Sequence, residues 1–278
     1  MHVTYEKRLL RVLDHVYDHL DGDLSLDELA DVAALSRFHF HRVFTAVTGE
    51  TVAQFTRRVR LTRAANELVL TDAPLDQVAR ICGYPNPKSF ARAFREHFAQ
   101  TPSAFRARGL PAPALRLNEH GDYEMYDVSI TELPARRIAG IAHKGDYMEV
   151  GRAFETAATS LAAQGHGARM GNMVGVYYDD PSSKPADELQ SFAALVVDDD
   201  AEVTPPLQVQ TLLGGKYAVL RYVGPYAGLA EAYSYLFGEW LPGSGEVPRD
   251  QPPYEFYENT PMDTKPEDLV TLISVALK

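Results

Sequence analysis

Two stretches in the first hundred or so residues repeat one pattern, and this repeat limits the fold more than any other feature. An offset of 49 or 50 residues superposes apolar, aromatic and arginine positions of the same kind. The matched pairs are Leu26 and Leu75, Asp27 and Asp76, Leu29 and Val78, Ala30 and Ala79, Phe40 and Phe90, Arg42 and Arg92, Phe44 and Phe94, Thr51 and Thr101, and Phe55 and Phe105. A fixed offset with the same aromatics indicates one supersecondary unit present twice.

The second copy indicates what the repeated unit is. An apolar period over residues 75–82 predicts a short helix, which Gly83 ends because glycine readily adopts left-handed backbone. A second helix is predicted from Asn86, a good N-cap, with Pro87 at its first position. Its polar front should carry Lys88, Ser89, Arg92 and Arg95. This is helix-turn-helix geometry, in which the second helix enters the major groove of DNA.

The first copy has the same organisation and leads into a long helix. Ser25 and Glu28 form a capping box, and Ser36 begins the first recognition helix. The outward face of that helix is predicted to hold Phe38, His41, Arg42 and Thr45. From Thr51 a helix should reach about Leu70, roughly 30 Å, close to the ~34 Å between successive major-groove faces. Both recognition helices could then occupy neighbouring grooves. The alternative is a scaffold of four or five helices whose charged face contacts only solvent.

Charge is distributed unevenly along the chain, whose net charge is −11. Residues 1–110 hold 15 Lys and Arg against 13 Asp and Glu, whereas residues 111–278 hold 12 against 25. Phosphate binding requires a local basic face rather than a basic protein. Double-stranded DNA therefore remains the predicted partner of the N-terminal part.

Composition sets the outer limits. The chain of 278 residues is long enough for two domains, and 45% hydrophobic with 23% charged residues is typical of a soluble globular protein. It has neither an apolar run of about eighteen residues nor a signal-peptide core, so we expect a cytoplasmic protein without a membrane partner. The single cysteine, Cys82, excludes an internal disulfide, and the pairs His15 with His19 and His39 with His41 lack a third ligand. No metal or other cofactor is expected.

Residues 24–106 closely resemble the AraC family of bacterial transcription regulators. The resemblance is carried by SLDELADVAALSRFHFHRVFTAVTG, RLTRAANEL and ICGYPNPKSFARAFREHFAQTPSAFR. It implies an all-α domain of about seven helices along one face of DNA, with base-reading positions at Phe38, His41, Arg42, Lys88, Ser89 and Arg92. With the neighbouring basic and capping residues, the predicted DNA-binding set is Arg37, Phe38, His41, Arg42, Asn86, Lys88, Ser89, Arg92 and Arg95.

The chain changes character after residue 108. Residues 109–122, GLPAPALRLNEHGD, contain two prolines and no apolar period, which is typical of a linker. Strand-like alternation follows from Val128 onward. We therefore predict a DNA-binding domain over 1–108, a linker over 109–122 and an α+β domain over 123–278.

The C-terminal part also contains an internal repeat, in the order β-β-α-β-β. An offset of 79 lays Gly145 on Gly224 and Tyr147 on Tyr226, and it superposes GVYYD, residues 175–179, on YEFYE. The predicted domain is a duplicated unit with a pseudo-twofold axis. Such an axis often leaves a cleft between the halves.

Glu255 is the main candidate for a ligand-binding residue in the C-terminal part. Strand alternation sends Glu255 and Tyr257 to one face, and the offset of 79 places Val176 and Tyr178 opposite them. The aromatic side chains expected around the carboxylate are Tyr178, Tyr257, Tyr147, Tyr226 and Trp240. A carboxylate among aromatic faces suits a lipophilic cation. Spacing alone favours an exposed strand glutamate beside ordinary core aromatics.

Nearly all of residues 123–278 resemble the GyrI-like effector-binding domains found fused to AraC-type DNA-binding domains. The carrying motifs are GDYMEV, VGPYAGL, EWLPGSG and PPYEFYENTP followed by KPEDLVTLISVAL. The resemblance implies that the glutamate of this motif, here Glu255, lines a ligand cavity.

Together the two parts predict a one-component transcription regulator rather than an enzyme, and no catalytic residue is assigned. Sequence-specific DNA and a small effector, cationic or lipophilic, are the expected partners, with RNA polymerase as a further candidate. One alternative is a hydrolase of small electrophiles, with Glu255 as general base and Tyr257 as phenol donor. Another is a gyrase-associated or nucleoid-associated protein that binds DNA without sequence preference.

Overall fold

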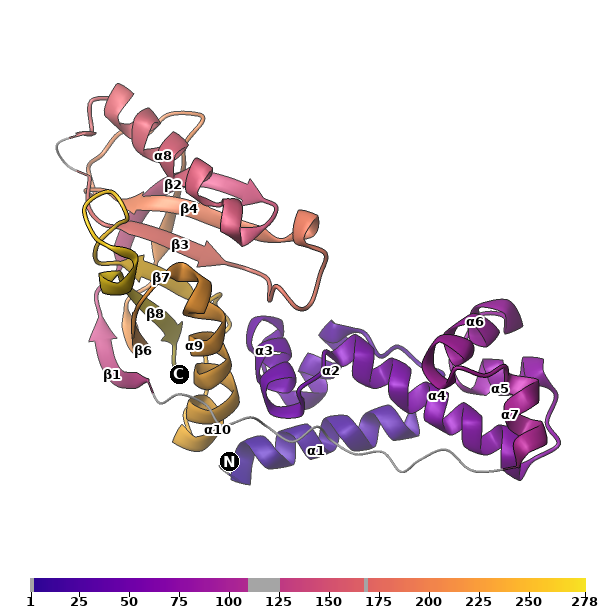
Figure 1. The fold of residues 1–278 in the computed structure, drawn as a ribbon. Helices are drawn as coiled ribbons and strands as arrows, with labels where there is room; N and C mark the ends of the chain where they lie inside the picture. The colour runs from indigo at the N-terminus through magenta and orange to yellow at the C-terminus, as the bar shows by residue number, and fades with distance from the viewer. Residues whose placement is uncertain (1–2, 110–125, 168–169) are drawn as a thin grey trace. The chain divides into compact units, whose positions relative to one another are not determined.

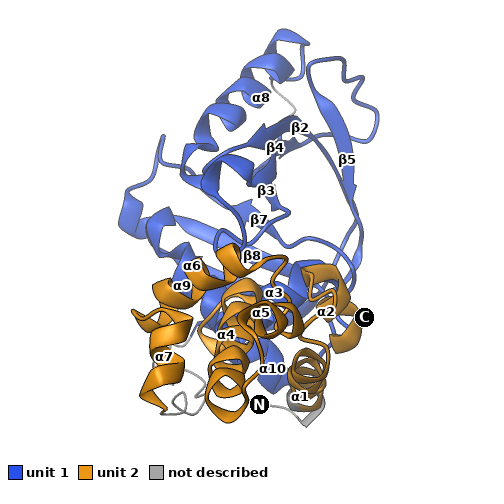
Figure 2. Cartoon of the chain, turned by 90° about the vertical axis from the view of Figure 1, so that its right-hand side faces the viewer, with its two compact units in different colours: residues 1–2, 35–47, 121–278 blue, residues 3–34, 48–120 orange. Residues whose placement is uncertain are grey.

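The computed structural model describes residues 3–109, 126–167 and 170–278, which form two compact units (Figure 2). Within these residues, unit 1 contains residues 35–47 together with the C-terminal part from residue 126. Unit 2 contains residues 3–34 and 48–109. All but the first residue of the predicted linker lies outside the described residues. Unit 1 thus includes the first predicted recognition helix as well as the C-terminal α+β fold.

The described N-terminal part is all-helical, as predicted (Figure 1). Its helices are α1 (Val3–Asp18), α2 (Leu26–Ala33), α3 (Arg37–Thr48), α4 (Val52–Leu70), α5 (Leu75–Ile81), α6 (Pro87–Phe98) and α7 (Pro102–Arg108). Thr51 and Gln54 form a capping box at the start of α4, and at the predicted box of α2 the Ser25 side chain accepts from the Glu28 amide. Asn86 is the N-cap of α6, where its Oδ1 accepts from the Ser89 amide at 2.9 Å and Pro87 stands at the first position. Local capping chemistry therefore sets where α4 and α6 begin.

Unit 2 closes around the aromatic side chains of the second repeat. Phe90, Phe94 and Phe105 form one buried cluster with Leu61 and other apolar residues of α4 and α5. Gly83 ends the turn after α5 with φ +74°, and an added Cβ would lie 2.5 Å from the Leu20 carbonyl oxygen. A larger residue would therefore clash as well as strain the backbone, so only glycine fits at the end of the turn after α5.

The C-terminal fold of unit 1 is one antiparallel sheet of eight strands, with helices α8 (Gly151–Ala163), α9 (Leu229–Tyr235) and α10 (Leu241–Ser244). The strand order is β1-β6-β8-β7-β3-β4-β2-β5. The strands are β1 (Asp127–Leu133), β2 (Arg136–Lys144), β3 (Met173–Tyr177), β4 (Gln190–Val196), β5 (Gln208–Leu212), β6 (Gly215–Val223), β7 (Tyr254–Tyr257) and β8 (Val270–Ala276). The short helices η1 (Tyr147–Glu149), η3 (Ala186–Glu188), η4 (Tyr226–Gly228), η5 (Leu236–Trp240) and η6 (Pro266–Asp268) complete it. The α+β fold class predicted for this part is confirmed.

The strand order is symmetric about the boundary between β7 and β3, which is where the pseudo-twofold axis passes. Each half contributes its first strand to the other half, because β1 pairs with β6 and β5 pairs with β2. At the boundary Glu255 lies directly opposite Gly175. Gly175 and Tyr177 therefore lie on the same face of the sheet as Glu255, whereas Val176 and Tyr178 lie on the other face. The expectation that Val176 and Tyr178 lie opposite Glu255 and Tyr257 is wrong.

Candidate functional site

Helix α6 presents its predicted DNA-reading side chains to solvent. Lys88, Arg92 and Arg95 are exposed, and the side chain of Arg92 is 84% exposed. Its Nε lies 3.3 Å from Glu96 Oε1, and Glu96 also pairs with Arg57. Exposed pairs of this kind are worth at most about 1 kcal/mol. Arg92 can therefore exchange its carboxylate partner for DNA at little cost.

A hollow of about 720 Å³ in unit 2 is lined mainly by side chains of α4 and α6. Its basic lining residues are Arg57, Arg60, Lys88 and Arg92. A concave surface with this many cations suits the phosphate backbone, which supplies most of the affinity of a protein for DNA. Asn86 and Ser89 lie at the start of the same helix, where the cap holds them.

Helix α3 differs from α6 because most of its predicted reading face is covered. Arg37 is exposed and Phe38 is half-buried, but His41 is only 5% and Arg42 only 6% exposed. The expectation that His41 and Arg42 point into solvent is therefore wrong for this structure. Helical periodicity gives the direction of a side chain, whereas the segment that covers it is determined by the rest of the fold.

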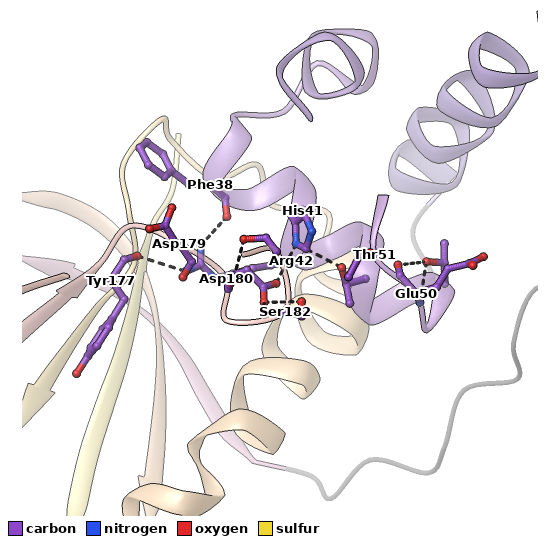
Figure 3. Close-up of polar contacts among 12 residues, drawn as sticks. Phe38, His41, Arg42, Glu50, Thr51, Tyr177, Asp179, Asp180 and Ser182 are labelled. Carbon is purple, nitrogen blue, oxygen red and sulfur yellow. Dashed lines mark hydrogen bonds and ion pairs between the residues drawn. The ribbon is translucent and has the colours of Figure 1, made fainter. Parts of the chain in front are cut away.

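The segment that follows β3 covers this face (Figure 3). Arg42 Nη2 donates to the carbonyl oxygens of Asp179 at 2.8 Å and Tyr177 at 3.3 Å, and Nη1 donates to the Phe38 carbonyl at 2.6 Å. His41 Nδ1 lies 3.1 Å from Asp180 Oδ2. Two of the three predicted base-reading groups of α3, His41 and Arg42, are thus held within unit 1 by polar contacts.

Glu255 lies at the centre of the sheet and is 4% exposed. The Tyr257 hydroxyl donates to Glu255 Oε2 at 2.7 Å, and the Tyr177 hydroxyl oxygen lies 2.8 Å from that of Tyr257. A Cβ added to Gly175 would lie 2.7 Å from the Tyr177 ring. Glycine opposite the carboxylate therefore leaves the space that Tyr177 occupies. The reading of Glu255 as an exposed strand residue is wrong.

Further aromatic rings enclose this chain of hydroxyls. The rings of Tyr226 and Phe154 stand edge-on to Tyr257 at centroid distances of 5.5 and 5.6 Å. The Tyr147 ring stands edge-on to Tyr177 at 4.8 Å. In α9 and η5 the Tyr233 and Phe237 rings stack at 6.2 Å. Among the described residues, the buried hydroxyls of Tyr226 and Tyr233 have no hydrogen-bond partner of good geometry.

Burial controls the titration of this cluster. It raises the pKa of Glu255 to about 7, while the hydroxyls of Tyr257 and Tyr233 and the charge of Arg42 act in the opposite direction. Burial also raises the pKa of Tyr233 and of Tyr257 well above the usual range, and the Glu255 carboxylate adds to both shifts. Burial thus favours the neutral forms of the Glu255 carboxyl and the tyrosine hydroxyls, whereas a positive charge nearby favours ionised Glu255.

The structure brings together some of the predicted site residues and separates others. Tyr257, Tyr226 and Tyr147 belong to the aromatic cluster around Glu255 or its immediate neighbours. Tyr178 does not, because it packs against the buried cluster of the opposite face and its hydroxyl lies 3.2 Å from Gln210 Oε1. Trp240 is half-buried at the end of η5, and no described contact joins it to Glu255.

Sequence reasoning missed Tyr177, Tyr233 and Phe237. Tyr177 takes the place expected for Tyr178 because Glu255 pairs with Gly175, and residues two apart in a strand share a face. The signal for the others was present, since Tyr226, Tyr233 and Phe237 recur at helical spacing after the VGPYAGL motif. The approach of Arg42 to this cluster has no local signal in the sequence.

A helix-turn-helix pair with one basic exposed recognition helix, joined to a duplicated α+β fold with a buried carboxylate, defines a class of DNA-binding regulators with a small-molecule domain. Residues 126–278 match the GyrI-like small molecule binding domain, and residues 29–108 match a helix-turn-helix domain. The chain therefore belongs to the GyrI-like family, carried here by an AraC-type DNA-binding transcriptional regulator.

One of its relatives matches most of the chain, and others match only part of it. The Right origin-binding protein of Escherichia coli K12 is 28% identical over 249 residues, which are 81% of each chain. The Transcriptional regulator Rob of Salmonella typhimurium is 36% identical over 122 residues, 42% of each chain. The Regulatory protein SoxS of Escherichia coli K12 is 32% identical over 106 residues, which are 38% of this chain and 99% of SoxS.

The described residues contain neither a membrane-spanning helix nor a cluster of metal ligands. Across residues 3–109, 126–167 and 170–278, no helix combines the length and the apolar character needed to span a bilayer. The same part of the chain contains no group of three or more His, Cys, Asp or Glu side chains placed to hold a metal ion.

Proposed function

We propose that the effector of this regulator is a flat or lipophilic cation and that it binds at Glu255. The proposal is supported by a carboxylate buried among the rings of Tyr177, Tyr233 and Tyr257. A buried carboxylate is costly unless it is neutral or paired with a cation. The buried hydroxyl of Tyr226, which has no hydrogen-bond partner among the described residues, offers an additional polar contact to such a ligand.

The same arrangement predicts a pH dependence of binding. A cation favours ionised Glu255, whose pKa is about 7 in the free protein. Cation affinity should therefore rise between pH 6 and pH 8 and level off above that range. Tyr177, Tyr226, Tyr233 and Tyr257 do not contribute in this window, because the pKa of each is raised above its usual value of 10.0.

The test uses a matched pair of probes, N-ethylquinolinium and the neutral isostere 1-ethylnaphthalene. Titration calorimetry at pH 8 compares the parent protein with Glu255→Gln, which keeps the size of the side chain. The variant should lose about tenfold or more in affinity for the cation and little for the neutral probe. Equal affinity of parent and variant for the cation would show that the effector is not held by this carboxylate.

We also propose that Arg92 and Arg42 each read the base edge of a guanine, each in its own major groove. Arginine donates two parallel hydrogen bonds to guanine O6 and N7. The exposed basic surface of α6 supports this role for Arg92, and the repeat supports the same role for Arg42 once its face is uncovered. Selection of duplexes with the purified protein should yield a consensus. Enrichment without any consensus would instead favour the nucleoid-associated alternative.

A hydrolase remains a second candidate because one observation favours it. A pKa of about 7 for Glu255, with the Tyr257 hydroxyl at 2.7 Å, suits a general base beside a phenol donor. Turnover of a small epoxide that disappears in Glu255→Gln would support this activity. Saturable binding of the same epoxide without turnover would exclude it for that substrate.

A further inference from the structure

The reading face of α3 and the aromatic cluster around Glu255 lie in one compact unit. His41 and Arg42 are 5% and 6% exposed there, although both belong to a helix that must enter a DNA groove. A recognition helix can read bases only with this face accessible. The covered face therefore represents a state in which α3 does not read DNA.

The donors of Arg42 are committed in this state. Nη2 donates to the carbonyl oxygens of Tyr177 and Asp179, and Nη1 donates to that of Phe38. Reading guanine requires two parallel guanidinium donors. Arg42 cannot make that contact and keep these hydrogen bonds at the same time.

Arg42 also behaves toward the aromatic cluster as a cationic ligand would. Its guanidinium carbon lies 5.9 Å from the ring centroid of Tyr233 and 5.7 Å from that of Phe237. Both distances are within the range of cation-π attraction. The carbonyl of Tyr177 that accepts from Arg42 belongs to the residue whose hydroxyl contacts Tyr257, the donor to Glu255. The side chain thus brings a positive charge to the immediate surroundings of the buried carboxylate.

Two histidines of α3 hold the helix in the same place. His41 Nδ1 pairs with Asp180, whose Oδ1 accepts from the amide and hydroxyl of Ser182 at 2.8 and 2.7 Å. His39 is fully buried, its Nε2 lies 2.9 Å from the Arg249 carbonyl oxygen, and its ring stacks on Phe237 at 5.8 Å. Burial lowers the pKa of His39 to about 3, so this ring is neutral and Nε2 is the donor.

We propose that Arg42 is an internal cation that occupies the effector position in the free protein, so that a cationic effector displaces it and frees the reading face of α3. This inference rests on the proposed cation site at Glu255. It adds the means of regulation, because one side chain serves in turn as a substitute ligand and as a base reader. Effector and DNA then favour the same undocked state, and each raises the affinity for the other by the same factor.

The first experiment measures the competition directly. Replacing Arg42 by Met removes the internal cation, and the matched control Arg92→Met removes the repeat-equivalent arginine, which is exposed on α6. At pH 8, Arg42→Met should bind N-ethylquinolinium about tenfold more tightly than the parent protein, because the competing state is lost. Arg92→Met should impair DNA binding and leave the cation affinity at the parental value.

The outcomes separate this inference from the proposed function. If the parent binds the cation through Glu255 and Arg42→Met binds it no more tightly, Arg42 does not compete and the inference fails while the proposed function stands. If neither the parent nor Arg42→Met binds any cation, both fail together.

A second variant tests the docking without any effector. Asp180→Asn keeps Arg42 and weakens the polar contact that holds His41. On a duplex selected with the purified protein, it should bind several-fold more tightly than the parent in the absence of ligand, because less of the protein is docked. Identical DNA affinities would show that the docking of α3 does not limit DNA binding, and this result would overturn the inference.

Discussion

The two recognition helices, α3 and α6, come from the same repeated sequence yet differ in what surrounds their outward faces. Their apolar backs match closely, since Phe40 and Phe44 have ring centroids 5.6 Å apart and Phe90 and Phe94 have theirs 5.5 Å apart. The arginines on their fronts do not match. The Arg92 side chain is 84% exposed, whereas Arg42 is 6% exposed.

The duplicated motif therefore determines which side chains of a helix face outward, but not whether the outward face is covered. The apolar back and the outward arginine follow from helical spacing, which both copies share. Only α3 belongs to the unit that contains the Glu255 cluster and the segment after β3. We infer that α6 is always ready to contact DNA and that α3 is the regulated reader.

The largest predicted effect follows from removing the carboxylate of Glu255, which lies in the unit that contains α3 and not in the unit that contains α6. Burial raises the pKa of Glu255 from 4.5 to about 7 in the folded protein. Such a raised pKa contributes stability below pH 4.5 that is lost as the pH rises through 7. Glu255→Gln should therefore unfold with a free energy up to about 3 kcal/mol higher than the parent at pH 8, and with a similar free energy at pH 4.5.

Urea denaturation at the two pH values checks this difference. The histidines are shared by both proteins, so their titration cancels in the comparison. Tyr257, Tyr177, Tyr226 and Tyr233 stay neutral throughout, because the pKa of each is raised above its usual value of 10.0. A stability difference that is the same at pH 4.5 and pH 8 would contradict a raised pKa for Glu255.

The second prediction compares the two arginines on DNA. Arg92→Ala should cost about 1 to 3 kcal/mol on the selected duplex and relax the base preference in one half-site only. Arg42→Ala should relax the other half-site but cost less in the absence of effector, because the parental Arg42 must first leave its contacts in unit 1. Binding assays on the selected duplex and on random DNA measure both. Equal losses on the two DNAs would identify the arginines as phosphate contacts.

The smallest predicted effect concerns how the two helices begin. Asn86 and Ser36 are equivalent in the repeat, but only Asn86 has a described capping bond, to the Ser89 amide at 2.9 Å. The Ser36 hydroxyl is buried and, among the described residues, has no partner. Asn86→Ala should lower the free energy of unfolding by about 1 kcal/mol. Ser36→Ala should leave it unchanged or raise it slightly, and thermal unfolding of both variants would reveal a reversed order.

The fold could be predicted from the sequence because its signals are local. The positions of the helices follow from the helix caps, the proline after Asn86 and the apolar period. Each of these signals is encoded by neighbouring residues alone. The duplicated order of strands and helices likewise survives in the motifs of the two halves. These features needed no knowledge of distant contacts.

The site was only partly predictable because it depends on register and on non-local packing. Alternation placed Glu255 and Tyr257 on one face, and their hydrogen bond agrees with that placement. The choice between Tyr177 and Tyr178 depended on the register between β3 and β7, which sequence similarity between the halves did not resolve. The approach of Arg42 joins residues about 135 positions apart, as its bond to the Tyr177 carbonyl shows, and no local pattern encodes it.

Chemical labelling of His41 in α3 and of His97 in α6 is the most direct test that α3 is docked in the free protein and released by a cation. His41 in α3 is 5% exposed, whereas His97 in the last turn of α6 is exposed. In the free protein, diethyl pyrocarbonate should modify His97 readily and His41 slowly, as peptide mass spectrometry can measure. Saturating N-ethylquinolinium should accelerate the modification of His41 and leave that of His97 unchanged. Rapid modification of His41 in the free protein, or no response to a cation that binds, would contradict a docked and releasable α3.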